Sequence, residues 1–196
     1  MQAAEIELKF PVADASALRR AAVALGFALL TERAFESNTL YDTADRTLRG
    51  RREILRLRLY NHRWTLTHKA PRPQDLTAEA EARYKTRIET ESAVEDGEAL
   101  AAVFAALGYT PVFRYEKFRE EWADATGHLV IDETPIGIWA ELEGPPEWID
   151  ARLEALGINP GICSTDSYGK LFLRWKNETG SPAEHLTFDE VGALVA

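Results

Sequence analysis

Glu5-Ile6-Glu7-Leu8-Lys9-Phe10 alternates charged and apolar residues from its first position to its last. Side chains of a β-strand point to opposite faces in turn, so this stretch predicts a strand with one charged face and one apolar face. In most proteins such a strand is half-buried and its charged face lies in water. The fold depends on whether that ordinary arrangement holds here, because the same alternation returns several times along the chain.

The composition indicates a protein with a proper core and excludes several classes of site and partner. The chain has 196 residues, 45% of them hydrophobic, which is enough for one domain or two small ones. It has no secretory h-region and no apolar run near the roughly 20 residues of a membrane span, so we expect a cytoplasmic protein without a membrane partner. The net charge of -9 argues against a nucleic-acid partner, because a polyanion would be repelled. Cys163 is the only cysteine, so any metal should be a hard ion held by carboxylates.

The alternation recurs in stretches that we expect to pair as hairpins. Residues 55–59 place leucines on one face and arginines on the other, and Asn61-His62 predicts a tight turn into a second strand that ends near Lys69. Eight candidate strands, at least five of them with both a charged and an apolar face, predict an antiparallel sheet that can close into a barrel. Helical spacing of apolar residues after positions 14, 94, 145 and 165 adds flanking helices, which makes the predicted fold α+β.

The charged faces have two interpretations. In an open sheet they form the wet outer surface, whereas in a closed barrel they point inward and amphipathic helices cover the apolar faces. Residue type favours the barrel, because the charges come in pairs two positions apart: Glu5/Glu7, Glu89/Glu91 and Glu141/Glu143, with Arg56/Arg58 and Lys117/Arg119. Paired carboxylates supply oxygen ligands for a hard divalent cation, and paired bases suit successive phosphate oxygens. The chain has no glycine-rich phosphate-binding loop, so side chains would have to bind the phosphate.

Three further segments are informative. We expect one domain over residues 1–177 and a C-terminal tail over 178–196, and the proline-containing segment 70–82 is predicted to be a mobile loop or lid. Residues 24–27 and 106–109 both read Ala-Leu-Gly-aromatic, which is compatible with duplicated halves or with a common helix ending. Arginines are concentrated between residues 46 and 63: Arg46, Arg49, Arg51, Arg52, Arg56, Arg58 and Arg63.

The ordered set of charged motifs resembles the CYTH family of triphosphate tunnel metalloenzymes. The set comprises Glu5-x-Glu7-x-Lys9, Arg56-x-Arg58, Lys69, Arg87-x-Glu89-x-Glu91, Lys117-x-Arg119, Asp132, Glu141-x-Glu143 and Lys170. It extends across nearly the whole chain, to about Trp175. The resemblance implies an eight-stranded antiparallel tunnel with flanking helices.

The resemblance also implies a role for each matching residue. The ligands of Mg²⁺ or Mn²⁺ would be Glu5, Glu7, Glu89, Glu91, Asp132, Glu141 and Glu143. The triphosphate would be bound by Lys9, Arg56, Arg58, Lys69, Arg87, Lys117, Arg119 and Lys170. Catalytic roles are expected for Lys9, Lys69 and Glu89. A shift of strand register would put Glu133 in place of Asp132, or Arg114 in place of Arg119.

Three functions fit this resemblance. Attack of water on the terminal phosphate would make the protein a triphosphatase for inorganic triphosphate, thiamine triphosphate or a nucleotide. Attack of a ribose 3′-hydroxyl on the α-phosphate would make it a class IV adenylate cyclase, and loss of a metal carboxylate would indicate a non-catalytic polyphosphate-binding module. Hydrolysis is favoured, because the chain lacks the His-Phe pair that often precedes the first motif in class IV cyclases, and all the carboxylates are present. Trp64, Tyr84 and Trp139 would be available to stack a base, although core packing is the more usual role. A homodimer is compatible with the sequence but not required by it.

Overall fold

The computed structural model describes residues 2–71 and 83–192, without the side chains of residues 2–5, 85 and 86. The strands are β1 (Gln2–Pro11), β2 (Ala28–Asp42), β3 (Ile54–Tyr60), β4 (Arg63–Ala70), β5 (Lys85–Val94), β6 (Thr110–Ala123), β7 (His128–Thr134) and β8 (Gly137–Glu143). The helices are α1 (Ala15–Ala24), α2 (Thr47–Gly50), α4 (Gly97–Ala106), α5 (Pro146–Ala155), the 3₁₀ turn η1 (Pro160–Ile162), α6 (Tyr168–Thr179) and α7 (Phe188–Val191). Most of the predicted lid, residues 72–82, lies outside the described residues, so that prediction stays open.

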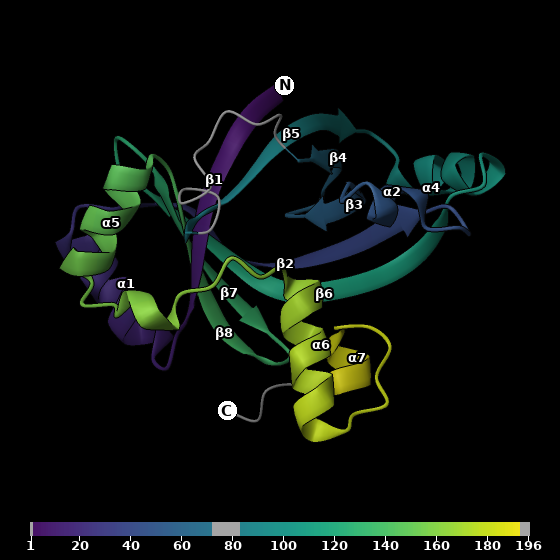
Figure 1. The fold of residues 1–196 in the computed structure, drawn as a ribbon. Coiled ribbons are helices and arrows are strands. Elements are labelled where there is room, and N and C mark those ends of the chain that lie inside the picture. Colours follow the sequence, from purple (N-terminus) through teal and green to yellow (C-terminus); the bar gives the residue numbers. More distant parts are fainter. Residues whose placement is uncertain (1, 72–82, 193–196) are drawn as a thin grey trace.

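Within these residues, eight antiparallel strands form a closed barrel in the order β1-β5-β4-β3-β2-β6-β7-β8, and β8 pairs back onto β1. The predicted α+β fold is confirmed. Figure 1 shows the helices outside the strands, with α1 and α5 on one side, α2 and α4 on the opposite side, and α6 and α7 below. Closure places Glu7 opposite Glu143 and Lys9 opposite Glu141, so the first and last charged motifs of the chain become neighbours.

The opening strand β1 has its charged face inside the barrel. Leu8 and Phe10 are 4% and 0% exposed and belong to an apolar cluster that includes residues of α1 and α5. Burial of side chains of this size contributes roughly 1.5–3 kcal/mol each. Glu7 and Lys9 on the other face are also buried, but they line the interior cavity. The ordinary arrangement of a half-buried strand is therefore inverted, as the barrel interpretation predicted.

Two further apolar clusters fix the other helices. Phe104 of α4 packs against Tyr41 and Leu57 of β2 and β3. Gly97 lets α4 begin directly on β4, because a Cβ atom at this position would lie 2.2 Å from the Trp64 ring. Helix α6 packs through Leu171 and Phe172 onto Tyr115, a residue of the inner wall, so α6 approaches one end of the barrel interior.

The structure also contains local features that the sequence pattern did not predict. The turn after β2 continues into α2, because the Asp42 carboxylate accepts hydrogen bonds from the backbone N–H groups of Leu48 and Arg49 at 2.9 and 3.0 Å. The segment after residue 177 is attached to the barrel, since Leu186 is fully buried and forms a parallel bridge with Tyr115. No helix in the two described ranges is long and apolar enough to cross a membrane.

Candidate functional site

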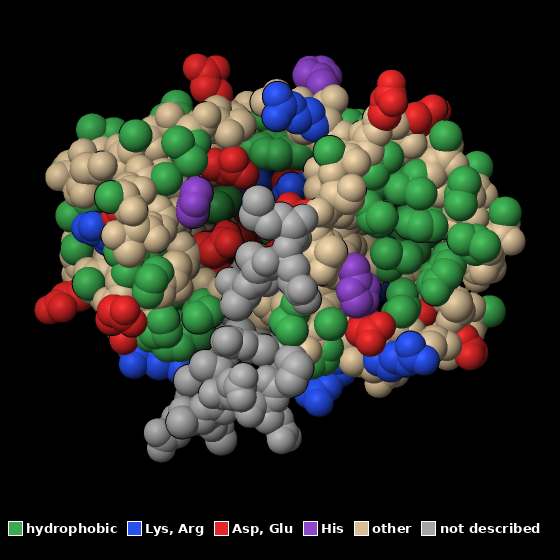
Figure 2. All heavy atoms as spheres, turned by 90° about the horizontal axis from the view of Figure 1, so that it is seen from above, with side chains coloured by type: hydrophobic (Ala, Val, Ile, Leu, Met, Phe, Trp, Pro, Cys, Tyr) green, Lys and Arg blue, Asp and Glu red, His purple; other side chains and the backbone are tan. Residues whose placement is uncertain are grey.

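The barrel interior holds a cavity of about 350 Å³, a volume within the range of small-molecule sites. Its described lining contains six bases, Lys9, Arg56, Arg58, Lys69, Lys117 and Arg119, and six carboxylates, Glu7, Glu89, Glu91, Glu121, Glu141 and Glu143. Figure 2 shows acidic and basic side chains together inside the hollow. The cavity wall is less polar than the charged motifs predicted, because Phe113 and Tyr115 of β6 and Tyr168 of α6 also line it.

Carboxylates gather where β1 meets β8. Glu7 and Glu143 are register partners, and Glu141 lies two pairs further along, on the same face and opposite Lys9. Glu141 accepts hydrogen bonds from Lys9 and from Arg119, the latter at 2.8 Å from Nη2 to Oε2. Among the residues the structure describes, no group of three or more acidic, histidine or cysteine side chains is arranged to hold a metal ion. The side chain of the predicted ligand Glu5 is not described.

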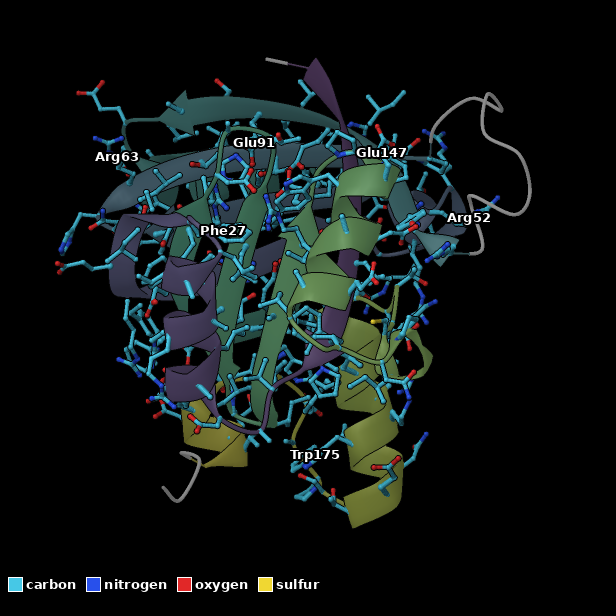
Figure 3. All side chains as sticks on the ribbon, turned by 90° about the vertical axis from the view of Figure 1, so that its left-hand side faces the viewer. Phe27, Arg52, Arg63, Glu91, Glu147 and Trp175 are labelled. Carbon is cyan, nitrogen blue, oxygen red and sulfur yellow. The ribbon has the colours of Figure 1, made fainter. Side chains whose placement is uncertain are left out.

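The wall formed by β3, β4 and β5 carries bases that are paired with glutamates. Lys69 Nζ lies 3.0 Å from Glu89 Oε2, and Arg56 Nη2 lies 3.5 Å from Glu91 Oε1. Burial alone would lower the pKa of Arg56, but Tyr115, Glu36 and Glu89 raise it, so this guanidinium stays charged. Glu91, which is labelled in Figure 3, lines the cavity. This wall presents fixed positive charge together with carboxylates.

Asp132 lies at the centre of a charged network in the barrel interior. It is 0% exposed and accepts hydrogen bonds from Lys117 at 2.9 Å, from Arg119 at 2.7 Å and from the Tyr168 hydroxyl at 2.6 Å. Burial alone would raise its pKa, but Arg119 and Lys117 hold the pKa far below the usual range. Asp132 does not line the cavity. The network therefore orients two bases that do line it.

Glu36 and Tyr168 are functional candidates that sequence reasoning missed. Glu36 is fully buried in β2, 3.4 Å from Lys117 and 3.7 Å from Arg119. The ring of Tyr168 lies 4.3 Å from Lys9 Nζ and 4.8 Å from Lys117 Nζ, close enough for cation–π attraction. Glu36 and Asn38 are two positions apart on one strand, the same spacing as the charged pairs in the sequence analysis. This spacing could have predicted that Glu36 faces the barrel interior. Tyr168 had no such signal, because only the docking of α6 brings it inside.

The structure also places the remaining predicted residues. Arg119 lines the cavity whereas Arg114 is exposed, and Asp132 points inward whereas Glu133 pairs with Arg19 and Arg33. Two predicted phosphate-binding residues do not line the cavity: Lys170, which has a side chain 71% exposed and pairs with Asp166, and Arg87, which is half-buried on β5. Trp64, Tyr84 and Trp139 all belong to apolar clusters rather than to the cavity wall.

The charge state of Glu36 gives a testable stability effect. Burial alone would raise its pKa, but Lys117 and Arg119 lower it from 4.5 to about 2. At about 1.4 kcal/mol per unit of pKa, Glu36→Gln should lower the free energy of unfolding at pH 7 by about 3 kcal/mol. A group with a depressed folded-state pKa stabilises above its unfolded pKa, so this difference should shrink as the pH falls from 4.5 towards 2. Urea denaturation of both proteins at several pH values measures it, and parallel stability curves would contradict it.

Comparison with known proteins places the site in context. A family model described as the CYTH domain matches residues 3–144. A protein of Methanocaldococcus jannaschii named "Putative adenylate cyclase" is 28% identical over 140 residues, which cover 71% of this chain and 75% of that protein.

Solved structures share the fold at low sequence identity. A "putative adenylate cyclase" from Vibrio parahaemolyticus superposes with a TM-score of 0.75 at 19% identity, covering 86% of this chain and 97% of that one. A "putative adenylyl cyclase" from Hippeastrum, described as having a dominant triphosphatase activity, superposes with a TM-score of 0.58 at 22% identity, covering 89% of this chain and 96% of that one.

Proposed function

Because the chain belongs to the CYTH domain family, we propose that it is a divalent-metal-dependent phosphohydrolase that removes the terminal phosphate of a small triphosphate. The observation that carries the proposal is the cavity lining, which brings six bases and six carboxylates together inside the barrel. Such a lining has no net charge and would not by itself attract a polyanion. The net charge of the lining would become positive when metal cations bind to the carboxylates. Binding of a triphosphate would therefore depend on the metal.

The metal ligands would be Glu7, Glu141 and Glu143, together with Glu5. Their donor set suits Mg²⁺ or Mn²⁺, because these ions prefer carboxylate oxygens and usually bind together with substrate phosphates. Glu141 at present accepts hydrogen bonds from Lys9 and Arg119. If Glu141 served as a metal ligand, Lys9 and Arg119 would be available to bind phosphate oxygens, so the metal and the triphosphate would bind in a mutually dependent way. The metal would supply neutralisation of charge on the phosphoryl group.

The bases would hold the triphosphate from two sides of the cavity. Arg56, Arg58 and Lys69 belong to β3 and β4, whereas Lys117 and Arg119 belong to β6, on the far side of β2. Ion pairs and hydrogen bonds already fix these side chains, so little reorganisation is needed when the substrate binds. Lys69 and Glu89, 3.0 Å apart, would orient the attacking water. Water would form a bond to the terminal phosphorus, the bridging P–O bond would break, and orthophosphate and a diphosphate would leave.

The description of one structural neighbour favours hydrolysis. The aromatic residues of the cavity do not decide between the two reactions: Trp64, Tyr84 and Trp139 lie in apolar clusters outside the cavity wall, but Phe113, Tyr115 and Tyr168 line it. The structurally similar Hippeastrum protein is described as having a dominant triphosphatase activity. An adenylate cyclase is the second candidate, on the strength of the name of the Methanocaldococcus jannaschii relative. A non-catalytic binding module is disfavoured, because every metal carboxylate of the family pattern is retained.

Product analysis tests the proposal. The protein is incubated with inorganic triphosphate, thiamine triphosphate or ATP in Mg²⁺ or Mn²⁺, and the products are separated by ion-exchange chromatography. We expect orthophosphate from at least one substrate, no release in EDTA, and unchanged release by Arg174→Ala, whose side chain is 57% exposed on α6. Cyclic AMP with pyrophosphate would instead establish the cyclase, and absence of turnover with all three substrates would favour the binding module.

A further inference from the structure

The outer face of α4 is apolar along its whole length. Val103 and Leu107 are 51% and 68% exposed, and Ala99, Ala102 and Ala106 are exposed as well. The inner face is also apolar and packs on the barrel through Phe104 and Leu100. A helix that is hydrophobic on all sides is normally buried on all sides. Figure 2 shows the resulting patch of hydrophobic side chains on the side of the molecule where α4 lies in Figure 1.

The other long helices do not share this feature. Their outer faces carry charged residues such as Arg20 on α1, Glu154 on α5 and Arg174 on α6, all exposed. The only ionisable residue of α4 is Glu98, in its first turn. Exposed apolar patches on a soluble protein usually mark an interaction surface.

The two ends of this apolar face have opposite charge. The acidic end consists of Glu95, Asp96 and Glu98 around the start of α4, where Gly97 lies against Trp64. The basic end consists of Arg46, Arg49, Arg51 and Arg52 in and around α2. Arg63 near the acidic end, and Asp45 and Glu53 near the basic end, reduce these charges without reversing them.

Pairing of the strands places the basic end beside the C-terminal end of α4. Asp42, whose carboxylate caps α2, is the register partner of Thr110, which follows α4 after a short turn. Figure 1 shows α2 and α4 next to each other. In Figure 3, Arg63 and Arg52, one from each end, lie on opposite sides of the molecule. The apolar face of α4 therefore runs from a negative end to a positive end.

We propose that this face is the contact of a two-fold homodimer in which the α4 helices of two copies pack antiparallel. A two-fold axis across the helix brings the acidic end of each copy to the basic end of the other, so the surface is complementary to itself. The exposed alanines allow the two helix backbones to approach closely. An anionic membrane would be repelled by the acidic end and by the net charge of -9.

The size of the face sets the strength of the dimer. A helix of ten residues is about 15 Å long, so α4 by itself covers less than the roughly 800 Å² per partner of a standard interface. The dimer should therefore be reversible, with a Kd of about 1–100 µM.

Sedimentation velocity over about 1–500 µM protein tests the dimer, since this range brackets the expected Kd. We expect a concentration-dependent shift from monomer to dimer, and we expect Val103→Glu with Leu107→Glu to raise the Kd at least about tenfold by placing charge in the contact. Leu173→Glu is the matched control, because Leu173 is 54% exposed on α6 and should leave the Kd unchanged. Circular dichroism verifies that each variant is folded.

A charge exchange tests the antiparallel orientation. Glu95→Lys and Arg49→Glu should each weaken the dimer, and the double variant should restore it, because each pair of opposite charges is then re-formed in reverse. A monomer at every concentration, a dimer insensitive to the Val103 and Leu107 variants, or a double variant no better than the single ones would overturn the proposal. Binding of the monomer to phosphatidylserine vesicles without self-association would overturn it in favour of a membrane surface.

Discussion

Glu141→Gln is expected to lower triphosphate turnover by roughly a thousandfold, equivalent to about 4 kcal/mol of activation free energy, without unfolding the protein. Glu141 accepts hydrogen bonds from Lys9 and Arg119, and it lies two register pairs away from Glu7 and Glu143, on the same face of the sheet. The amide keeps the shape of the side chain and an acceptor oxygen, but it removes the negative charge that would hold the metal. Rates measured at saturating metal and substrate give the effect.

Metal binding supplies a readout that does not depend on activity. Calorimetric titration with Mn²⁺ should show affinity at least about tenfold weaker in Glu141→Gln than in the wild type. Arg56→Ala is the matched comparison on the opposite wall, where Arg56 lies 3.1 Å from the Thr67 hydroxyl. It should raise KM, because it removes a phosphate contact made before the transition state as well as in it, and it should leave Mn²⁺ affinity unchanged. Undiminished turnover in both Glu141→Gln and Glu5→Gln would exclude this site as the place of catalysis.

Asp132→Asn is expected to lower the free energy of unfolding by roughly 3–5 kcal/mol, the usual cost of breaking a buried ion pair from one side. Lys117 is 2% exposed, and the Arg119 side chain is 12% exposed. Each would lose the carboxylate nearest to it, in a place that water hardly reaches. Urea denaturation at pH 7 measures the change.

The neighbouring residue provides the control for Asp132. Glu133→Gln breaks ion pairs with Arg19 and Arg33 at the barrel surface, and it should cost no more than about 1 kcal/mol because solvent screens those charges. The same variants also show whether Asp132 orients Lys117 and Arg119 or binds the metal itself. If Asp132 only orients Lys117 and Arg119, Asp132→Asn removes no metal ligand, and its loss of Mn²⁺ affinity should be smaller than that of Glu141→Gln. A large loss of Mn²⁺ affinity with unchanged stability would instead make Asp132 the metal ligand that the family pattern implies.

The opening strand alone indicated a half-buried strand, and the barrel with its inverted faces was predicted from the paired charges that recur on several strands. Residues two positions apart on a strand lie on the same face, independently of the tertiary structure. The sequence therefore showed that Glu141 and Glu143 share one face, and that Arg56 and Arg58 share one face. The helices that cover the apolar faces were equally local features, defined by spacing and by capping residues such as Asp14 and Asp96.

The partners of each charge were decided only by the tertiary structure. Whether Asp132 meets a metal or two bases depends on how β7 is registered against β6, where Arg119 faces Asp132. Tyr168 enters the cavity because α6 docks on the barrel. The structure was needed to show which face of α4 packs on the barrel and which face stays exposed. Periodicity fixes the direction of a side chain relative to its own strand or helix. What that side chain touches depends on contacts between segments distant in sequence, and here a single closure of β8 onto β1 brings Glu7 to Glu143 and Lys9 to Glu141.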